Sequence, residues 1–371
     1  MSKRLVLRTV LLFVVFSLAL TACAQPAAPA AAPAQEAQPA APAAEAQPAE
    51  EAEESAPAVS SLKIAIITTT TLEEPWNTAM VQSLERVMAE KPHDLAIEYV
   101  IQENVASPDG ERVMREYAKT GEYGIIWAHG LYPDAVSALY EEYPDIVWAM
   151  SGSGYEPIGK NAYWVQMYVH EPAYLLGMIA GMMTETNVIG AVAAYPFPNV
   201  NLPINAYVAG AKAANPDVKV KMTYIESWFD PAKAKESTLA QIATGADFVY
   251  AERFGPFEAC QEKGVYAFGH YVDQNSLAPE TVVASTLARW DPMAKFLIDE
   301  WYAHVVDGKP YAAPMAEVVY LMKDGGSDIS GFNALEAVIP QEVRDAVAAA
   351  RQEILQGEMQ VPFNEEPVVS D

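Results

Sequence analysis

The chain has 371 residues, 51% of them apolar, and a formal net charge of −26. That length suggests about two domains of ordinary size, and the apolar share is large enough for a sizeable core. The excess of 49 acidic over 23 basic side chains argues against nucleic-acid binding and against electrostatic docking on anionic lipid. Two cysteines and five histidines offer little for a disulfide framework or a zinc site. The composition therefore favours an acidic two-domain protein that acts on a small molecule.

Residues 1–23 have the features of a secretory signal. Basic residues near the start precede an apolar run from Val10 to Leu20, which is too short to span a bilayer. The run ends in Leu20-Thr21-Ala22-Cys23, which resembles the bacterial lipobox, whose cysteine is acylated and becomes the mature N-terminus. We therefore expect a lipid anchor on Cys23, which would hold the protein at the extracytoplasmic face of the cell membrane. An ordinary cleavage site beside an unmodified cysteine is the alternative.

Residues 24–60 consist almost entirely of Ala, Pro, Glu and Gln, with no large apolar side chain before Val59. Such a segment cannot bury enough surface to offset the entropy of ordering, and its prolines and like charges keep it extended. We therefore expect a disordered tether between the membrane and the folded body.

From residue 61 onward the sequence alternates strand-like and helix-like segments. Continuous apolar runs predict strands covered on both faces, and apolar residues at helical spacing predict the helices between them. The first series comprises strands at 62–67, 95–101, 124–128 and 146–150 and helices at 76–90, 107–119 and 133–143. A βα series of this kind predicts a parallel sheet with right-handed crossovers.

A second series begins near residue 169. It comprises helices at 173–183, 202–214 and 231–243 and strands at 188–194, 218–225, 248–251 and 265–268. The segments at 282–286, 292–306, 318–322 and 341–356 must complete both sheets, so we expect the chain to cross between the lobes more than once. The predicted fold is α/β, with two doubly wound parallel-sheet lobes joined by a hinge. We place the first lobe at 61–168 plus about 284–315, the second at 169–283 plus about 316–362, and a tail at 363–371.

Ligands of open parallel sheets bind beyond the carboxyl ends of the strands, so the residues that follow each predicted strand are the candidates for a site. An aromatic side chain occurs in each of the six loops in question: Trp76, Phe197, Trp228, Phe254, Tyr271 and Trp290. Aromatic faces can sandwich a flat ring, and a polar side chain at the rim, such as Asn77 or Asp273, can orient it by hydrogen bonds. Packing between the lobes is the alternative role for any one of these rings.

Catalytic and metal-binding patterns are scarce. The sequence has no G-x-S-x-G turn, no phosphate-binding Gly-rich loop and no zinc-protease motif. Cys260 fits a buried apolar position, and the adjacent Glu73 and Glu74 fit a solvated surface better than an acid–base pair. His129 and His270 follow strands and could meet across a cleft as neutral hydrogen-bonding groups. We expect no catalytic residue, no cofactor and no metal.

Several motifs occur in a characteristic order. They are Glu171 to Ala180 (EPAYLLGMIA), Gly210-Ala211-Lys212 followed by Asn215-Pro216, Trp228 to Pro231 (WFDP), Gly245-Ala246-Asp247, Phe268-Gly269 ending in Asp273-Gln274, and Gly357 to Pro362 (GEMQVP). On these motifs, the chain from Leu62 to Pro362 resembles the basic membrane lipoprotein family, which are substrate-binding lipoproteins of ABC importers similar to the purine nucleoside receptors. The resemblance implies a periplasmic-binding-protein type I clamshell, a purine stacked between aromatic residues of the two lobes, and an ABC permease as partner.

The resemblance also implies roles for particular residues. The Trp76-Asn77 pair matches the family's aromatic-Asn pair after the first strand. Asp273 matches the second acid of the family's G-x-D-x-D-Q stretch, but Tyr271 stands in place of the first acid. The family's acid before the aromatic-Asn pair is represented only by the Glu73-Glu74 pair. Those acids resemble ribose-binding groups, so their loss favours a free base such as adenine over a nucleoside.

We therefore predict a monomeric, membrane-tethered receptor that binds a purine base or nucleoside and hands it to an ABC permease. A receptor for a sugar, or for a small carboxylate anchored by Arg253 or Arg289, is the alternative among binding proteins. The rivals from other classes are a surface nucleoside hydrolase and a structural surface protein.

Overall fold

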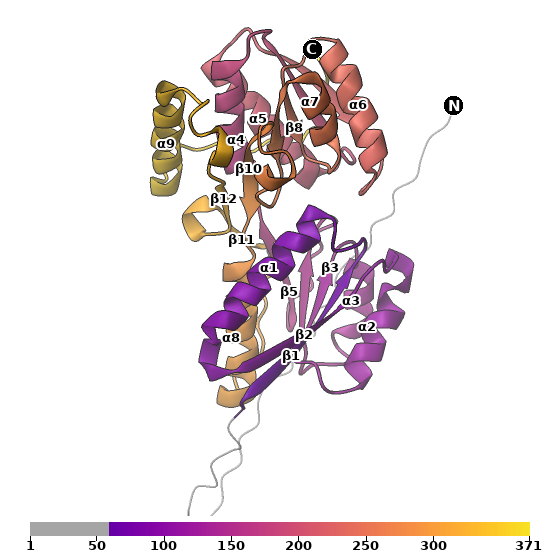
Figure 1. Cartoon of the computed structure of the whole chain (residues 1–371). Coiled ribbons are helices and arrows are strands. Elements are labelled where there is room, and N and C mark those ends of the chain that lie inside the picture. The colour runs from indigo at the N-terminus through magenta and orange to yellow at the C-terminus, as the bar shows by residue number, and fades with distance from the viewer. Residues whose placement is uncertain (1–58) are drawn as a thin grey trace, which may run out of the picture. The chain divides into compact units, whose positions relative to one another are not determined.

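The computed structural model describes residues 59–371. The predicted signal sequence at 1–23 with its acylated Cys23, and the predicted tether as far as residue 58, lie outside the described residues. Within the part described, no helix combines the length and the apolar character that crossing a membrane requires. Two six-stranded sheets organise this part of the chain, and each sheet forms the centre of one lobe (Figure 1).

The sheet of the first lobe has the strand order β11-β5-β4-β3-β1-β2, and every pairing in it is parallel. Its strands are β1 (Ser61–Thr68), β2 (Ala96–Gln102), β3 (Ile125–His129), β4 (Val147–Ser151), β5 (Ala162–Met167) and β11 (Val318–Tyr320). One face packs against α1 (Pro75–Glu90) and α8 (Asp291–Asp307), and the other against α2 (Gly110–Lys119) and α3 (Pro133–Leu139). Because both faces are covered, the central strands β3 and β4 are buried at every residue, which explains their continuous apolar sequences.

The sheet of the second lobe has the order β12-β10-β9-β8-β6-β7, and only the short β12 runs antiparallel to its neighbour. Its strands are β6 (Val188–Ala193), β7 (Lys219–Tyr224), β8 (Phe248–Ala251), β9 (Tyr266–Gly269), β10 (Val282–Ala288) and β12 (Ser327–Ile329). One face packs against α4 (His170–Met183), α5 (Pro198–Ala214) and α9 (Gln341–Gln356), and the other against α6 (Pro231–Ala243) and α7 (Pro256–Lys263). The predicted α/β fold with two parallel-sheet lobes is confirmed.

Helices α4 and α5 approach each other very closely. A Cβ atom at Gly177 would lie 1.9 Å from the carbonyl oxygen of Tyr207, and one at Gly210 would lie 2.0 Å from the carbonyl oxygen of Tyr174. Only glycine leaves room for this contact. The packing of these two helices therefore accounts for the glycines in the first two sequence motifs.

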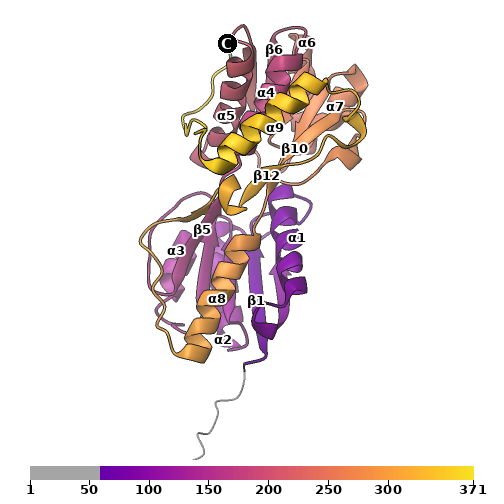
Figure 2. The same cartoon turned by 90° about the vertical axis from the view of Figure 1, so that its left-hand side faces the viewer.

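The chain crosses between the lobes three times, from β5 to α4, from β10 to α8 and from β11 to β12 (Figure 2). Two crossings lie a few residues beyond the predicted positions. Residues 284–288 still belong to β10 in the second sheet, and β11 pairs with β5 in the first sheet although we placed residues from about 316 onward in the second lobe. β10 remains largely buried as far as Ala288, beyond the polar Ser285 and Thr286, so composition does not mark the point where the chain leaves the sheet.

The C-terminal tail returns to the second lobe and lies along the edge strand β7. The backbone N–H of Asp371 donates to the carbonyl oxygen of Val220 at 3.0 Å. The hydroxyl of Ser370 accepts from the backbone N–H of Met222 at 2.9 Å. These bonds pair an otherwise open sheet edge and fix the course of the tail.

Candidate functional site

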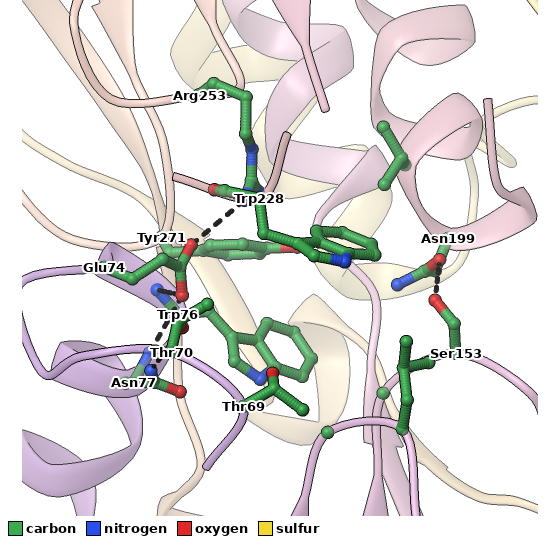
Figure 3. A pocket seen from close by; sticks show the side chains of 14 residues that line it. Thr69, Thr70, Glu74, Trp76, Asn77, Ser153, Asn199, Trp228, Arg253 and Tyr271 are labelled. Atoms are coloured by element: carbon green, nitrogen blue, oxygen red, sulfur yellow. Dashed lines mark hydrogen bonds and ion pairs between the residues drawn. The ribbon is translucent and has the colours of Figure 1, made fainter. Parts of the chain in front are cut away.

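A cavity lies where the carboxyl ends of the two sheets face each other (Figure 3). Its lining consists of Thr69, Thr70, Glu74, Trp76, Asn77, Gly130, Leu131, Gly152, Ser153, Asn199, Val200, Trp228, Arg253 and Tyr271. Each of these residues lies in the loop that follows a strand or in the first turn of the next helix, which is where open parallel sheets bind ligands. The cavity holds about 60 Å³ and shares Leu131, Gly152, Ser153 and Asn199 with a second cavity of about 670 Å³.

Trp76 forms the wall contributed by the first lobe. Its ring stacks on the His129 imidazole, with centroids 5.0 Å and planes 15° apart, and meets the Trp290 indole edge-on at 4.8 Å. Burial lowers the pKa of His129 to about 3, so the imidazole behind Trp76 is neutral at pH 7. Ser151 Oγ lies 2.8 Å from His129 Nδ1 and holds that ring in place. Trp76 is therefore backed by a packed, uncharged aromatic layer.

Trp228 forms the wall contributed by the second lobe. Its ring packs against Phe197 at a centroid distance of 5.7 Å, and the guanidinium carbon of Arg253 lies 5.8 Å from the ring. In Figure 3 the indoles of Trp228 and Trp76 lie one above the other, and Tyr271 lies beside them. The Tyr271 ring contacts Trp76 at a centroid distance of 5.1 Å. The cavity is thus bounded by three aromatic rings.

A buried ion pair joins the two lobes beside these rings. Arg253 Nη1 lies 3.1 Å from Glu74 Oε1, and each side chain is 5% exposed. Glu74 Oε2 accepts from the backbone N–H of Trp76 at 3.0 Å, so the same carboxylate caps helix α1, which has Pro75 in its first turn. Burial raises the pKa of Glu74 to about 7, although the positive charge of Arg253 opposes the shift.

Glu252 holds Arg253 from the other side. Arg253 Nη2 donates to Glu252 Oε1 at 2.7 Å, and Arg253 Nε donates to Oε2 at 2.9 Å. Arg253 Nη1 also donates to the backbone carbonyl of Trp228 at 3.1 Å. Burial raises the pKa of Glu252 above its usual range, although the positive charge of Arg253 opposes the shift. Arg253 therefore connects a carboxylate of the first lobe to the backbone that carries the Trp228 indole.

Two amide side chains provide hydrogen bonds at the rim of the cavity. Asn77 Nδ2 donates to Thr70 Oγ1 at 3.0 Å and to the carbonyl oxygen of Thr71 at 2.8 Å. Asn199 Oδ1 accepts from Ser153 Oγ at 2.5 Å, a hydrogen bond between the lobes. Contacts within residues 59–371 thus leave Oδ1 of Asn77 as an acceptor and Nδ2 of Asn199 as a donor for a ligand.

Half of the predicted ligand-binding side chains line the cavity, namely Trp76, Asn77, Trp228 and Tyr271. Phe197 lines the larger adjoining cavity. Phe254 lies in a surface groove between α6 and α7, where it packs against Phe229 and Phe257. Trp290 is fully buried behind Trp76 and supports it without lining the cavity.

Asp273 also lies outside the cavity. Its side chain is exposed and lines a separate hollow, which Tyr271 also lines. The carboxylate accepts from the backbone N–H of Asn275 at 3.1 Å and from Nδ2 of Asn333 at 3.0 Å. Tyr271 has a left-handed backbone conformation with φ of 67°, so the chain turns there instead of continuing as an extended strand end. That turn explains why proximity to β9 in the sequence did not bring Asp273 into the site.

The sequence interpretation missed the ion pair. Glu74 was expected in solvent, but it is buried against Arg253, 179 residues away. The sequence indicated where each residue lies, because both stand in loops that follow strands, but it did not indicate that the two residues pair. The two histidines do not meet across the cavity. His129 lies behind Trp76, whereas His270 Nδ1 lies 2.5 Å from the hydroxyl of Tyr250 inside the second lobe.

Comparison with known protein families agrees with this geometry. The model of the Bmp family, described as ABC transporter substrate-binding protein PnrA-like, matches residues 62–364. The chain belongs to this family. The family is described as one of ABC transporter substrate-binding proteins.

Proteins similar to this chain differ in the ligands that their names give. The chain is 32% identical over 290 residues to a putative ABC transporter glucose-binding protein of Haloferax volcanii, an alignment that covers 77% of this chain and 70% of that protein. It is 28% identical over 271 residues to a purine-binding protein of Brucella abortus, covering 72% and 73% of the two chains. It is 29% identical over 214 residues to an ABC transporter nucleoside-binding protein of Lactococcus lactis, an alignment that covers 52% of this chain and 58% of that protein.

Solved structures show the same fold. A solute-binding protein of an ABC transporter from Aeropyrum pernix superimposes with a TM-score of 0.66 at 20% identity, covering 82% of this chain and 94% of that one. A second solute-binding protein, from Conexibacter woesei, superimposes with a TM-score of 0.65 at 21% identity and covers 81% of this chain and 99% of that one. The two lobes therefore have the periplasmic-binding-protein type I fold.

Proposed function

We propose that this Bmp-family protein is the receptor of an ABC importer and binds a purine base or nucleoside between Trp76 and Trp228. The observation that carries the proposal is the pair of indoles, one from each lobe, on a cavity that both lobes line (Figure 3). A flat heteroaromatic ring that stacks on an indole gains about 0.5–1.5 kcal/mol beyond the area it buries. A ring held by both indoles favours the closed arrangement of the lobes.

The polar rim suits the edge of a purine. Asn77 Oδ1 is placed to accept from an amino group or a ring N–H, and Asn199 Nδ2 to donate to a ring nitrogen or carbonyl. The Brucella abortus and Lactococcus lactis relatives, which are named as purine-binding and nucleoside-binding, support the same ligand class. The departure from the family's acids at Tyr271 favours a free base.

Binding requires the lobes to move. A cavity of about 60 Å³ is well below the ~150 Å³ of a cavity that takes a single benzene ring, so a bicyclic ring does not fit it in this arrangement of the lobes. The ligand would enter when the lobes part at the three crossings and would be enclosed when they close. The Glu74–Arg253 ion pair and the Ser153–Asn199 hydrogen bond join the lobes only when they are this close together. A permease would then receive the closed, loaded receptor.

The remaining parts of the proposal concern the N-terminal region. We propose that Cys23 is acylated and that residues 24–60 tether a monomeric receptor to the extracytoplasmic face of the membrane. The lipobox-like sequence that ends in Cys23 supports this anchor.

A sugar is the second candidate ligand. The Haloferax volcanii relative, at 32% identity, is named as a putative glucose-binding protein. The cavity also carries hydroxyl and amide groups, from Thr69, Thr70 and Ser153 among others, which hydrogen-bond sugars readily. An aromatic wall suits the apolar face of a pyranose as well as a purine, so the ligand class has to be measured.

The deciding experiment is calorimetric titration of protein that has been unfolded, dialysed and refolded to remove bound ligand. We expect adenine or a purine nucleoside to bind with submillimolar or tighter affinity and glucose to give no heat of binding. Binding of glucose with no purine binding would replace the proposal with the sugar receptor. Release of free base from adenosine or inosine during incubation would overturn the receptor function itself.

A further inference from the structure

The cavity of about 670 Å³ that adjoins the indole pair, which we call the vestibule, has a distinctive lining. Besides the residues that it shares with the smaller cavity, it is lined chiefly by four aromatic rings, two carboxylates and one amide: Tyr155, Tyr168, Phe197, Phe363, Glu317, Glu365 and Gln166. Among the described residues that line it, there is no lysine, arginine or histidine. The vestibule is therefore rich in hydrogen-bond acceptors and has no positive charge of its own.

The two carboxylates line the same cavity, and no counter-ion accompanies them among the described residues. Tyr168 donates its hydroxyl proton to Glu317 Oε2 at 2.7 Å, and within residues 59–371 neither Glu317 nor Glu365 forms a side-chain ion pair. Burial raises the pKa of Glu317, and the nearby charge of Glu365 raises it further. Glu317 is partly buried and Glu365 is exposed, and a cation placed between the two carboxylates would be stabilised by both charges.

Gln166 adds a third acceptor. Its side chain is 2% exposed, and Nε2 donates to the carbonyl oxygen of Gly152 at 3.1 Å. Oε1 is buried and has no hydrogen-bond donor anywhere in the described part of the chain. A buried acceptor without a donor costs free energy, and a ligand N–H would satisfy it.

The aromatic rings are held in position. Tyr168 and Phe363 meet edge-on with centroids 5.4 Å apart, and His170 packs against both. Burial lowers the pKa of His170 to about 4, so this ring supplies no positive charge near neutral pH. Asn201 Nδ2 donates to the backbone carbonyl of Glu365 at 2.8 Å, which fixes the tail segment that carries Phe363 and Glu365. Aromatic faces of this kind attract ammonium groups as well as flat rings.

We propose that the vestibule binds a protonated amine, held by Glu317, Glu365 and Gln166 and flanked by the aromatic rings. The amine is either an aminoalkyl substituent of a purine that extends past Ser153 and Asn199 from between the indoles, or a separate small organic ammonium ion. Only the first of these two sources rests on the proposed function. The ammonium N–H groups would donate to the three acceptors, and no bond is made or broken.

The first test compares two ligands that differ only in the terminal group, 9-(2-aminoethyl)adenine and 9-(2-hydroxyethyl)adenine. We expect the amine to bind stripped wild-type protein about tenfold more tightly than the alcohol. The preference should fall to less than about threefold in Glu317→Gln and Glu365→Gln, and it should weaken with added salt. Glu366→Gln is the matched control, because it removes the same charge from the next residue of the tail, which does not line the vestibule. Equal binding of amine and alcohol, or a preference that survives Glu317→Gln, would overturn the proposal.

The second test separates this inference from the proposed function. Benzylammonium and benzyl alcohol are titrated into the same four proteins in the absence of any purine. Stronger binding of benzylammonium that depends on Glu317 supports the vestibule even if adenine itself does not bind. Binding of adenine together with equal or tighter binding of the two alcohols would leave the purine receptor intact and show that the vestibule takes a neutral hydroxyl.

Discussion

At the scale of single residues, Glu74 links the cavity wall to the contact between the lobes. One carboxylate oxygen caps α1 next to Trp76, and the other faces Arg253 of the second lobe. Burial holds the pKa of Glu74 at about 7, above the 4.5 of a free glutamate. The folded protein therefore binds this proton more tightly than the unfolded chain. The stabilisation is complete below about pH 4.5 and is lost as the pH rises through about 7.

Glu74→Gln should remove this pH dependence. Relative to the variant, the wild type should lose about 2–3 kcal/mol of unfolding free energy between pH 5 and pH 8, since one unit of pKa shift corresponds to about 1.4 kcal/mol. Urea unfolding at several pH values measures the difference. Glu73→Gln, at the exposed neighbour, should run parallel to the wild type. Parallel curves for Glu74→Gln as well would refute the coupling.

Trp228 and Asp273 should differ sharply in their effect on binding. Trp228→Ala removes one wall of the cavity, and we expect purine affinity to fall by about tenfold to a hundredfold. Asp273 lies outside the cavity, so Asp273→Ala should leave the affinity within about twofold of wild type. Calorimetry on both variants gives the comparison. A large loss from Asp273→Ala with none from Trp228→Ala would place the ligand elsewhere.

At the scale of elements, the close packing of α4 against α5 stabilises the second lobe. Gly177→Ala would push a methyl group against the Tyr207 carbonyl, so the helices must separate. We expect a loss of about 3 kcal/mol or more of unfolding free energy, as for severe overpacking of a core. Thermal unfolding measures it against Gly331→Ala, where an added Cβ meets no atom nearer than 4.0 Å. Equal melting temperatures for the two variants would contradict this packing.

The elements that the sequence predicted share a clear physical signal. Strands such as β1 and β8 are buried on both faces, so their apolar runs are continuous, and the helices between them have regular apolar spacing. Strand β5 was not among the predicted strands, although five of the six residues of AYWVQM are apolar and all six are buried. Strand β12 has three residues, too few for periodicity to show.

The site was predictable to the extent that it follows strand ends. Trp76 and Trp228 were predicted because each follows a strand and is too apolar to be left in water. The pairing of Glu74 with Arg253 depends on how two lobes meet, and no local pattern encodes a contact across 179 residues. Asp273 was misplaced because a strand-end rule cannot foresee the left-handed turn at Tyr271.

At the scale of the whole molecule, the described lobes are joined by three chain crossings and by side-chain contacts across the cavity. If the cavity must open to admit a ring, ligand-free protein should be more expanded than loaded protein. Small-angle scattering should show a smaller radius of gyration after a saturating purine is added. Arg253→Met, which removes the inter-lobe ion pair, should reduce that compaction. An identical radius with and without ligand would argue against hinge closure.

The charge of the whole chain bears on the choice of ligand. A net charge of −26 does not impede a neutral purine, whereas it draws organic cations toward the protein. We expect the organic cations that this charge attracts to bind at Glu317 and Glu365 in the vestibule.

The most direct test of the central claim is a crystal structure of the protein with adenine bound. We expect the adenine ring between the indoles of Trp76 and Trp228, with its edge against Asn77 or Asn199. Adenine bound outside that cavity, or a sugar occupying the space between the indoles of untreated protein, would contradict it.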